Sequence, residues 1–177
     1  MIEKKDNMLD NNMVLFTEKF KDKVINVTFP ITRGETRTNQ NFYFDKIVEV
    51  MRIGELVWKD YRDKYNNPDK EHHGIKHIRE VLLLSFKLCV EYEGKLDGID
   101  FISSLYMCTI ASIVHDSHSY ENRENHHELA SLDVSSYLSS SKLRNSIPNI
   151  DNKFISIVSS MVFEHRASYK GEYSYRI

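Results

Sequence analysis

The chain has 177 residues and a net charge of −2, and this length is enough for one domain with a sizeable core. Hydrophobic residues make up 41% and charged residues 28%, as in ordinary globular proteins, and the nearly balanced charge argues against general adhesion to nucleic acids or membranes. Six glycines and three prolines are too few for the many turns of a sandwich or a barrel, so we expect an all-α protein.

The two cysteines of the chain, Cys89 and Cys108, fall inside apolar helical patterns. Their spacing matches no metal or redox motif, so we expect buried thiols in a reducing compartment. The first six residues lack the apolar core of a signal peptide, and no apolar stretch is long and charge-free enough to span a bilayer. These features predict a cytoplasmic protein.

Residues 1–41 have the weakest pattern, and we expect an irregular N-terminal arm there, followed by a helical domain over 42–177. Within the arm, 15–20 favours a short helix, 23–29 alternates like a strand, and 33–41 is polar like a loop. The arm either packs on the domain or is partly mobile, as termini commonly are. The alternative is an oligomer contact or a lid.

A first clear helix is predicted over residues 44–65. One of its faces is apolar at helical spacing and contains Ile47, Val50, Val57 and Tyr61. Gly54 lies on the same face, although a glycine inside a helix costs about 1 kcal/mol relative to alanine. We therefore expect Gly54 to mark a close helix crossing.

The next predicted helix begins near His73 and ends near Tyr92. His73 and His77 are four residues apart and share one face. The same face continues through Val81, Leu84 and Leu88. This pattern points His77 toward the core, where a single histidine is more often a hydrogen-bonded core residue than a metal ligand. Its interpretation therefore depends on the other histidines.

Asp100 predicts the N-cap of a central helix over 101–114, which is apolar on almost every side. Such a helix is normally buried all round. It ends abruptly in His115 and Asp116, which are two good metal ligands. We expect this pair at the rim of the core, partly dry but still reachable.

After a polar loop, another helix is predicted from Asn125, with Asn125 as its cap and Glu128 reaching back in a capping box. His126 and His127 lie in its first turn, where the partial positive charge lowers the proton affinity of an imidazole. A neutral imidazole is the form that binds metal. One side of this helix is apolar and contains Ala130, Val134 and Tyr137.

Asp151 predicts the cap of a last helix. Its inward stripe contains Phe154, Val158, Met161 and His165. His165 is thus the second histidine that helical periodicity alone turns toward the core. All eight histidines of the chain lie between His72 and His165, whereas purely surface histidines would be spread more evenly.

Candidate metal ligands therefore come from several helices: His77, His115, Asp116, His165, and either His126 or His127. Helix bundles commonly hold metals in this way. Imidazole combined with carboxylate suits first-row divalent metals, so we expect one or two ions of Mn, Fe, Co, Ni or Zn. Sites for calcium or magnesium alone are built from oxygen ligands and differ from this set.

Residues 73–81, 114–116, 125–128 and 164–166 read HGIKHIREV, VHD, NHHE and EHR. Together they resemble the HD-domain superfamily of metal-dependent phosphohydrolases, and the resemblance covers roughly residues 70–175. A His-Asp pair alone occurs by chance. Preceded by an apolar helix and by an H-G-x-x-H segment on an earlier helix, it is a fairly specific signal.

The resemblance implies an HD-like bundle of about five to six helices that hydrolyses a phosphomonoester or phosphodiester, often in a nucleotide. It also implies that His77, His115 and Asp116 bind metal, with His115 and Asp116 in the catalytic role. The metal would lower the pKa of bound water and polarise a phosphoryl oxygen, while Asp116 would bridge two metals or orient the hydroxide. His127 and His165 match best the histidines that complete a second metal site in the family.

Phosphate oxygens require positive side chains, and arginine offers a two-point grip. We expect Arg123, Arg166 and Lys170 to take this role, the last two because they directly follow a candidate ligand. Lys76 and Arg79 are better explained as parts of solvated helix faces and ordinary salt bridges. The expected partner is a small phosphorylated molecule, and a homo-oligomer is an open alternative to a monomer.

The family pattern includes a further aspartate on a downstream helix. Twelve residues follow His165 in this chain and none is an aspartate, so we expect either a chain that was cut short, without the usual C-terminal helix, or a protein that has lost this ligand. Asp133, Glu164 and Glu172 are the acidic substitutes that the sequence offers. Because a lost ligand weakens a metal site, the alternative function is a non-catalytic HD-like module that binds a nucleotide or a protein. A purely structural helical protein is the least favoured interpretation.

Overall fold

The computed structural model describes residues 14–28, 37–65, 74–93, 95, 98–119, 124–140, 143, 146, 147 and 150–165, with residues 37–41 described by their backbone alone. Six α-helices and one 3-10 helix lie in these ranges. They are α2 (Glu18–Thr28), α3 (Arg37–Tyr61), η2 (Arg62–Tyr65), α5 (Ile75–Glu91), α6 (Phe101–Val114), α7 (His126–Ser139) and α9 (Asn152–Phe163). The described ranges contain no strand, so the prediction of an all-α helical bundle is confirmed.

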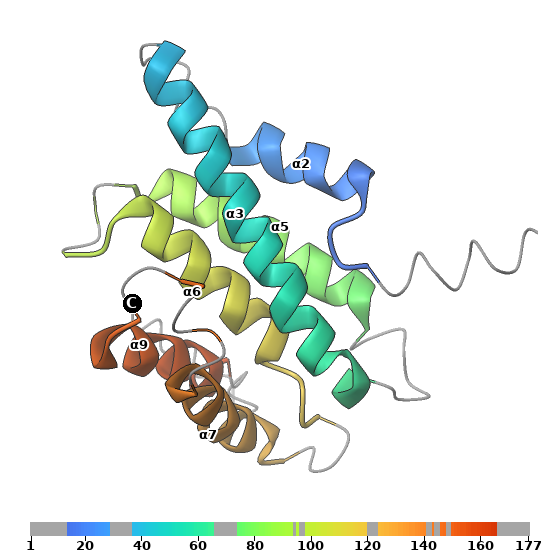
Figure 1. Cartoon of the computed structure of the whole chain (residues 1–177). Coiled ribbons are helices and arrows are strands. Elements are labelled where there is room, and N and C mark those ends of the chain that lie inside the picture. The colour runs from blue at the N-terminus through green and yellow to red at the C-terminus, as the bar shows by residue number, and fades with distance from the viewer. Residues whose placement is uncertain are drawn as a thin grey trace, which may run out of the picture.

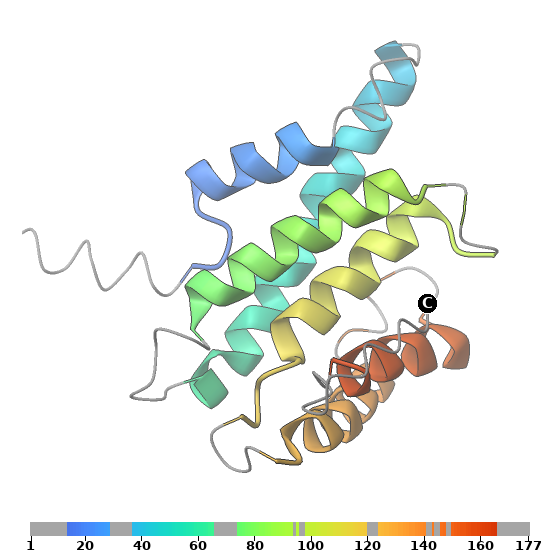
Figure 2. The same cartoon turned by 180° about the vertical axis from the view of Figure 1, so that it is seen from behind.

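Helix α6 lies at the centre of the bundle (Figure 1). It packs against α3, α5 and α9, and α7 packs on α9. Figure 2 shows from behind that α6 lies between the α3–α5 pair and the α7–α9 pair. Side chains on almost every side of α6 are buried, from Phe101 to Val114, as its apolar sequence predicts. A helix that is buried on almost every side therefore ends directly at His115.

Helix α3 buries the face that its periodicity predicts, including Ile47, Val50, Val57 and Tyr61. Gly54 on this face marks a close crossing, because a Cβ atom there would lie 2.7 Å from the Phe16 ring and 2.8 Å from Cγ2 of Thr109. The helix begins at Arg37, so the loop prediction is wrong for residues 37–41, and the predicted division at residue 42 falls inside α3.

Helix α2 replaces the strand that was predicted over 23–29, and the strand prediction is wrong as far as Thr28. The β-branched residues of this segment alternate as in a strand. However, Phe20, Val24 and Thr28 are buried at four-residue spacing, which is the spacing of a helix face. Packing against α5 thus decides the structure of a segment whose local pattern is ambiguous.

Two side chains anchor the chain just before α2. The carboxylate of Glu55 accepts the backbone N–H groups of Leu15 and Phe16, each at 3.0 Å. The guanidinium of Arg79 donates to the carbonyls of Leu15 and Val14 at 2.8 and 2.6 Å. Residues 14–28 are therefore packed on the domain, whereas residues 1–13 and 29–36 lie outside the described ranges. The expectation of a lid or an oligomer contact stays a prediction.

Helix α5 buries a different face from the predicted one. Leu84 and Leu88 are 59% and 46% exposed, so their assignment to the inward stripe is wrong. The buried residues are Ile78, Leu82, Phe86 and Cys89. Two apolar stripes lie one residue apart on this helix, and its packing against both α6 and α2 selects the second one. His77 then lies at the border of the buried face, with a side chain 31% exposed.

Two of the three predicted helix caps are confirmed. The Asp100 carboxylate accepts the backbone N–H of Ser103 at 2.9 Å, and the Asp151 carboxylate accepts that of Phe154 at 2.7 Å. The capping box at Asn125 is wrong, because the Asn125 side chain makes no capping hydrogen bond and its backbone lacks the extended conformation of an N-cap. None of the helices in the described ranges has the length and apolar character needed to cross a membrane.

Candidate metal centre

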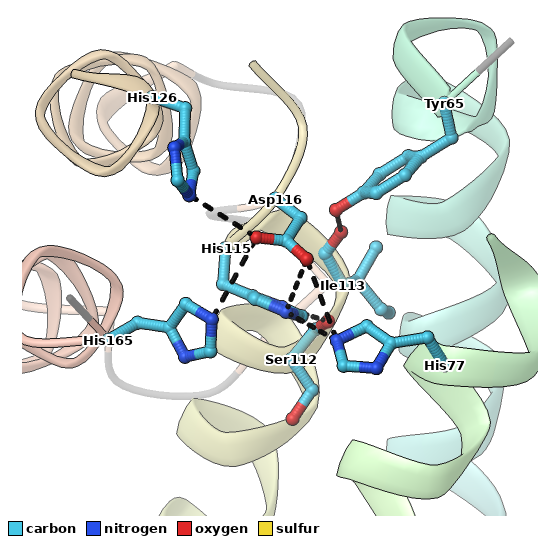
Figure 3. Close-up of polar contacts among 8 residues, drawn as sticks. All are labelled: Tyr65, His77, Ser112, Ile113, His115, Asp116, His126 and His165. Carbon is cyan, nitrogen blue, oxygen red and sulfur yellow. Dashed lines mark hydrogen bonds and ion pairs between the residues drawn. The ribbon is translucent and has the colours of Figure 1, made fainter. Parts of the chain in front are cut away.

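His115 and Asp116 follow the last residue of α6, and each is only 3% exposed. The backbone N–H of His115 continues the helical pattern by donating to the carbonyl of Ala111 at 2.9 Å. Its Nδ1 lies 2.8 Å from the carbonyl oxygen of Ser112. A carbonyl only accepts hydrogen bonds, so Nδ1 carries the proton and Nε2 keeps the lone pair that a metal needs. Figure 3 shows the Nε2 side of this ring facing Asp116.

A tyrosine from η2 supports the end of α6. The Tyr65 hydroxyl donates to the carbonyl of Ile113 at 2.6 Å, and Figure 3 shows it reaching this carbonyl from the α3–η2 side. Burial, and then the negative charge of Asp116, hold the pKa of Tyr65 well above its ordinary value. The hydroxyl therefore stays protonated and donates at physiological pH. This bond fixes the turn of backbone that carries His115 and Asp116.

Three side chains bring one donor atom each into a compact group. Nε2 of His77 lies 3.2 Å from Nε2 of His115. Oδ2 of Asp116 lies 3.5 Å from the His77 nitrogen and 3.2 Å from the His115 nitrogen. The three donor atoms all lie within 4.8 Å of one another. Two imidazoles and one carboxylate are the donor set of a transition-metal site.

The second oxygen of Asp116 faces another pair of histidines. Nε2 of His126, at the start of α7, lies 3.4 Å from Oδ1, and Nε2 of His165, just after α9, lies 3.8 Å from it. The rings of His165 and His115 are also in edge-to-face contact, with centroids 4.3 Å apart. Each carboxylate oxygen of Asp116 is therefore directed at two imidazole nitrogens (Figure 3).

His165 is kept in its neutral form. Burial, and then the nearby His115 imidazole, lower the pKa of His165 to about 4, although its side chain is 42% exposed. At neutral pH one of its ring nitrogens therefore keeps a lone pair that is available to a metal or to a proton donor. The side chains of His165 and His77 are the most exposed members of the group, whereas His115 and Asp116 are buried.

The structure brings His126 to Asp116, whereas the sequence favoured His127. His127 is buried, and its ring lies edge-on to Phe163 with centroids 5.8 Å apart. Adjacent residues of a helix point in directions about 100° apart, so they face different neighbours. A signal for this was present in the sequence, because His127 continues the buried stripe of Ala130, Val134 and Leu138 at helical spacing. The role of His127 as a metal ligand stays a prediction.

Asp133, one of the proposed substitutes for the missing aspartate, belongs to a neighbouring ion-pair network. Its carboxylate binds the ammonium of Lys64 and lies 3.5 Å from Nε2 of His118. Burial alone would raise the pKa of Asp133, but hydrogen bonds from Lys64 and Tyr61 hold it below its ordinary value. Asp133 is therefore an ionised partner of Lys64 and is not part of the three-residue group around Asp116.

All three predicted phosphate-binding residues fall outside the part of the chain that the structure describes. Arg123, Arg166 and Lys170 lie outside the described residues, as do His73 and Glu172. Glu164 is exposed at the end of α9 and Lys76 is exposed at the start of α5. Arg79 binds the backbone before α2 and has a structural role.

No protein-family model, curated protein or solved structure matches this chain. Its chemistry therefore has to be argued from the centre itself. The arrangement places imidazole nitrogens around a buried carboxylate, at a helix end whose backbone is held by Tyr65 and whose His115 ring is oriented by Ser112. Such a group can bind a divalent cation and can hold or pass a proton at Asp116.

Proposed function

We propose that this chain is a metal-dependent phosphohydrolase of the HD-domain type, which cleaves a phosphomonoester or phosphodiester, with a nucleotide as the expected substrate. The observation that carries the proposal is the convergence of His77, His115 and Asp116, whose donor atoms lie within 4.8 Å of one another at the end of a buried helix. A carboxylate that is 3% exposed is costly to bury unless cations or hydrogen bonds compensate its charge. A divalent cation held together with the two imidazoles meets this need.

The donor set fits a first-row ion such as Mn, Fe, Co, Ni or Zn. The Ser112 carbonyl orients His115 through Nδ1, which is the usual outer support of a metal-binding histidine. When bound, such an ion would lower the pKa of a coordinated water and polarise a phosphoryl oxygen. Each oxygen of Asp116 faces its own pair of histidines, and this arrangement supports a centre with two metal ions. His126 and His165 would then bind the second ion.

The remaining steps fall to side chains of this chain. The two oxygens of Asp116 face two different histidine pairs. As a carboxylate, Asp116 can also accept a hydrogen bond from a water molecule bound among these histidines. Neutral His165, with its partly exposed ring, can accept or deliver a proton on the open side of the centre. The side chains predicted to bind the phosphate oxygens are still Arg123, Arg166 and Lys170. A cytoplasmic location is likewise part of this proposal.

The proposal is tested by phosphoester hydrolysis with purified, metal-loaded protein. We expect turnover of one or more nucleotides or of a generic aryl phosphate by the wild type. Asp116→Asn removes the charge shared by all four histidines and should lower kcat at least 100-fold, in line with the loss of a metal-held nucleophile. Asp63→Asn, at a side chain 86% exposed, removes the same charge at the surface and should leave turnover unchanged. Equal activity in Asp116→Asn and Asp63→Asn would refute the proposal.

The alternative is a non-catalytic HD-like module that binds a nucleotide or a protein partner. One observation favours it. Within the described residues the candidate metal group contains a single carboxylate, that of Asp116, because Asp133 forms an ion pair with Lys64 and does not belong to the group. The two functions differ in one measurement. Metal-loaded protein that binds a nucleotide in calorimetry and leaves it intact after prolonged incubation is a binding module, whereas release of phosphate or nucleoside identifies the hydrolase.

A further inference from the structure

The two cysteines of the chain meet at the interface between α5 and α6. Cys89 is the last buried residue of α5, and Cys108 lies in the middle of α6. Their sulfur atoms are 3.4 Å apart, and both are free thiols. The sequence separates them by 19 positions and matches no redox motif, so this contact is created by the packing of the two helices and not by local spacing.

We propose that Cys89 and Cys108 form a redox-active pair, which is oxidised to a reversible intramolecular disulfide by hydrogen peroxide or another small hydroperoxide. This inference rests on the packing of α5 against α6 and is independent of the proposed phosphohydrolase activity. The sulfur atoms have to approach each other by about 1.4 Å to reach the disulfide bond length of about 2.0 Å. We expect rotation of the two side chains about χ1 to supply this movement.

The two thiols are not equivalent. The two thiols share one S–H···S hydrogen bond, and this bond raises the pKa of Cys89 and lowers that of Cys108. Cys108 is also the more exposed of the two, since Cys89 is only 7% exposed. The attacking species in thiol chemistry is the thiolate. Cys108 is therefore the residue that meets the peroxide, and Cys89 is the resolving thiol.

The reaction balances in two steps. The Cys108 thiolate attacks one oxygen of the peroxide, the O–O bond breaks, and the products are a sulfenic acid on Cys108 and hydroxide, which takes a proton to become water. The Cys89 sulfur then attacks the Cys108 sulfur, the S–O bond breaks, and a second water leaves with the Cys89 proton. Two thiols are oxidised to one disulfide, and one peroxide is reduced to two waters.

The same helix interface carries the metal centre at its other end. Along α5 and α6 the facing pairs are Cys89 with Cys108, Ser85 with Ser112 at 3.3 Å, and His77 with His115 at 3.2 Å. At the helical rise of about 1.5 Å per residue, Cys89 lies about 18 Å from His77 along α5. The disulfide is thus remote from the centre, but it would fix the pairing of the two helices that supply His77 and His115.

The test uses the full chain and hydrogen peroxide as the oxidant, followed by quenching, denaturation and counting of free thiols. Because the chain has only two cysteines, the count is unambiguous. We expect both thiols to be lost together, intact mass to fall by two hydrogen atoms, and dithiothreitol to restore both. The oxidised protein should migrate as a single chain and have a higher Tm, because the cross-link removes conformational entropy from the unfolded chain.

Single serine variants separate the two roles. Cys89→Ser leaves Cys108 without its resolving partner, so peroxide should produce a sulfenic acid on Cys108 that dimedone traps. Cys108→Ser should react with peroxide at least tenfold more slowly. Two free thiols per chain after excess peroxide, a disulfide between two chains, or a mass gain of oxygen without an intramolecular disulfide would each overturn the proposal. These outcomes are read from the wild type, so they stand even if a serine variant fails to fold.

Discussion

Nδ1 of His115 lies 2.8 Å from the carbonyl oxygen of Ser112, one helical turn earlier in the chain. This contact fixes which ring nitrogen carries the proton and leaves Nε2 facing Asp116 Oδ2 at 3.2 Å. The orientation of the candidate ligand is thus set by the backbone of α6 itself, before any metal is present.

We expect His115 to adopt the Nδ1–H tautomer. Because a carbonyl can only accept, the neutral ring should be protonated at Nδ1. Long-range proton–nitrogen NMR spectra of the metal-free protein at pH 8 should show the Nδ1–H tautomer for His115. A predominant Nε2–H tautomer would mean that the Ser112 contact does not orient this ring.

Tyr65→Phe removes the hydroxyl that donates to Ile113 and should have two effects. The free energy of unfolding should fall by about 1–3 kcal/mol, because a buried carbonyl loses its donor. Metal affinity should also fall several-fold, since the backbone that carries His115 and Asp116 becomes less well fixed.

Tyr137→Phe is the matched control for Tyr65→Phe. It removes a tyrosine hydroxyl that donates to Asp60 at 2.8 Å, which is no part of the metal group. It should lower stability without changing metal affinity in calorimetric titrations. Similar metal affinities in both variants would show that Tyr65 has no positioning role.

Acidification should destabilise the metal-free protein through His165. Its pKa of about 4 lies below the ordinary value of 6.5, so between these two values the unfolded chain binds a proton that the folded chain does not. Stability from this residue is therefore fully present above about pH 6.5 and is lost as the pH falls toward 4. Urea denaturation at pH 7 and pH 5 should show a smaller loss of stability in His165→Asn than in the wild type. Equal losses would contradict the lowered pKa.

Gly54→Ala tests the crossing between α3, α6 and the segment before α2. The added Cβ would lie 2.7 Å from the Phe16 ring and 2.8 Å from Thr109 Cγ2, and both side chains are buried. Overpacking of this kind costs about 1–3 kcal/mol, and with two contacts shorter than 3.0 Å we expect the cost here to lie above the helix-propensity gain of about 1 kcal/mol from replacing glycine. We expect a net loss in the free energy of unfolding, measured by chemical denaturation.

A double-mutant cycle provides the check on Gly54→Ala. Phe16→Leu shortens the side chain that the new Cβ would meet, so the cost of Gly54→Ala should be smaller in that background. An unchanged cost would place the strain elsewhere, and a stabilised Gly54→Ala protein would contradict the close crossing.

The central helix was predictable from the sequence because its signals agree with one another. Residues 101–114 are apolar all round, Asp100 caps them, and the apolar run stops at His115. The buried face of α5 was not predictable in the same way. Two apolar stripes lie one residue apart there, and α2, which helps to select the buried one, itself has the local pattern of a strand. The wrong assignment of α2 as a strand therefore led to the wrong buried face for α5.

The candidate metal centre was predictable in its main members and less so in its neighbours. The positions of His115 and Asp116 follow from the end of the apolar run, and that of His165 follows from helical periodicity. His77 was assigned to a stripe whose Leu84 and Leu88 are exposed, yet it lies at the border of the buried face, and the structure brings it to the other three residues. The helical spacing of His127 with the buried residues Ala130, Val134 and Leu138 already indicated that His127 faces the core. The preference for His127 followed the family resemblance and not this spacing. Two further contacts hold the centre: the Ser112 carbonyl orients the His115 ring, and the Tyr65 hydroxyl binds the Ile113 carbonyl across the core. No sequence pattern predicts either contact.

The most direct test of the account is the metal content of the purified protein by elemental analysis. Wild type and Asp63→Asn should each contain near-stoichiometric Mn, Fe, Co, Ni or Zn after loading and removal of excess metal, and Asp116→Asn should contain almost none, because Asp116 lies between all four histidines. A wild-type protein without bound metal after loading, or an Asp116→Asn protein that retains the wild-type amount, would contradict the assignment of this centre.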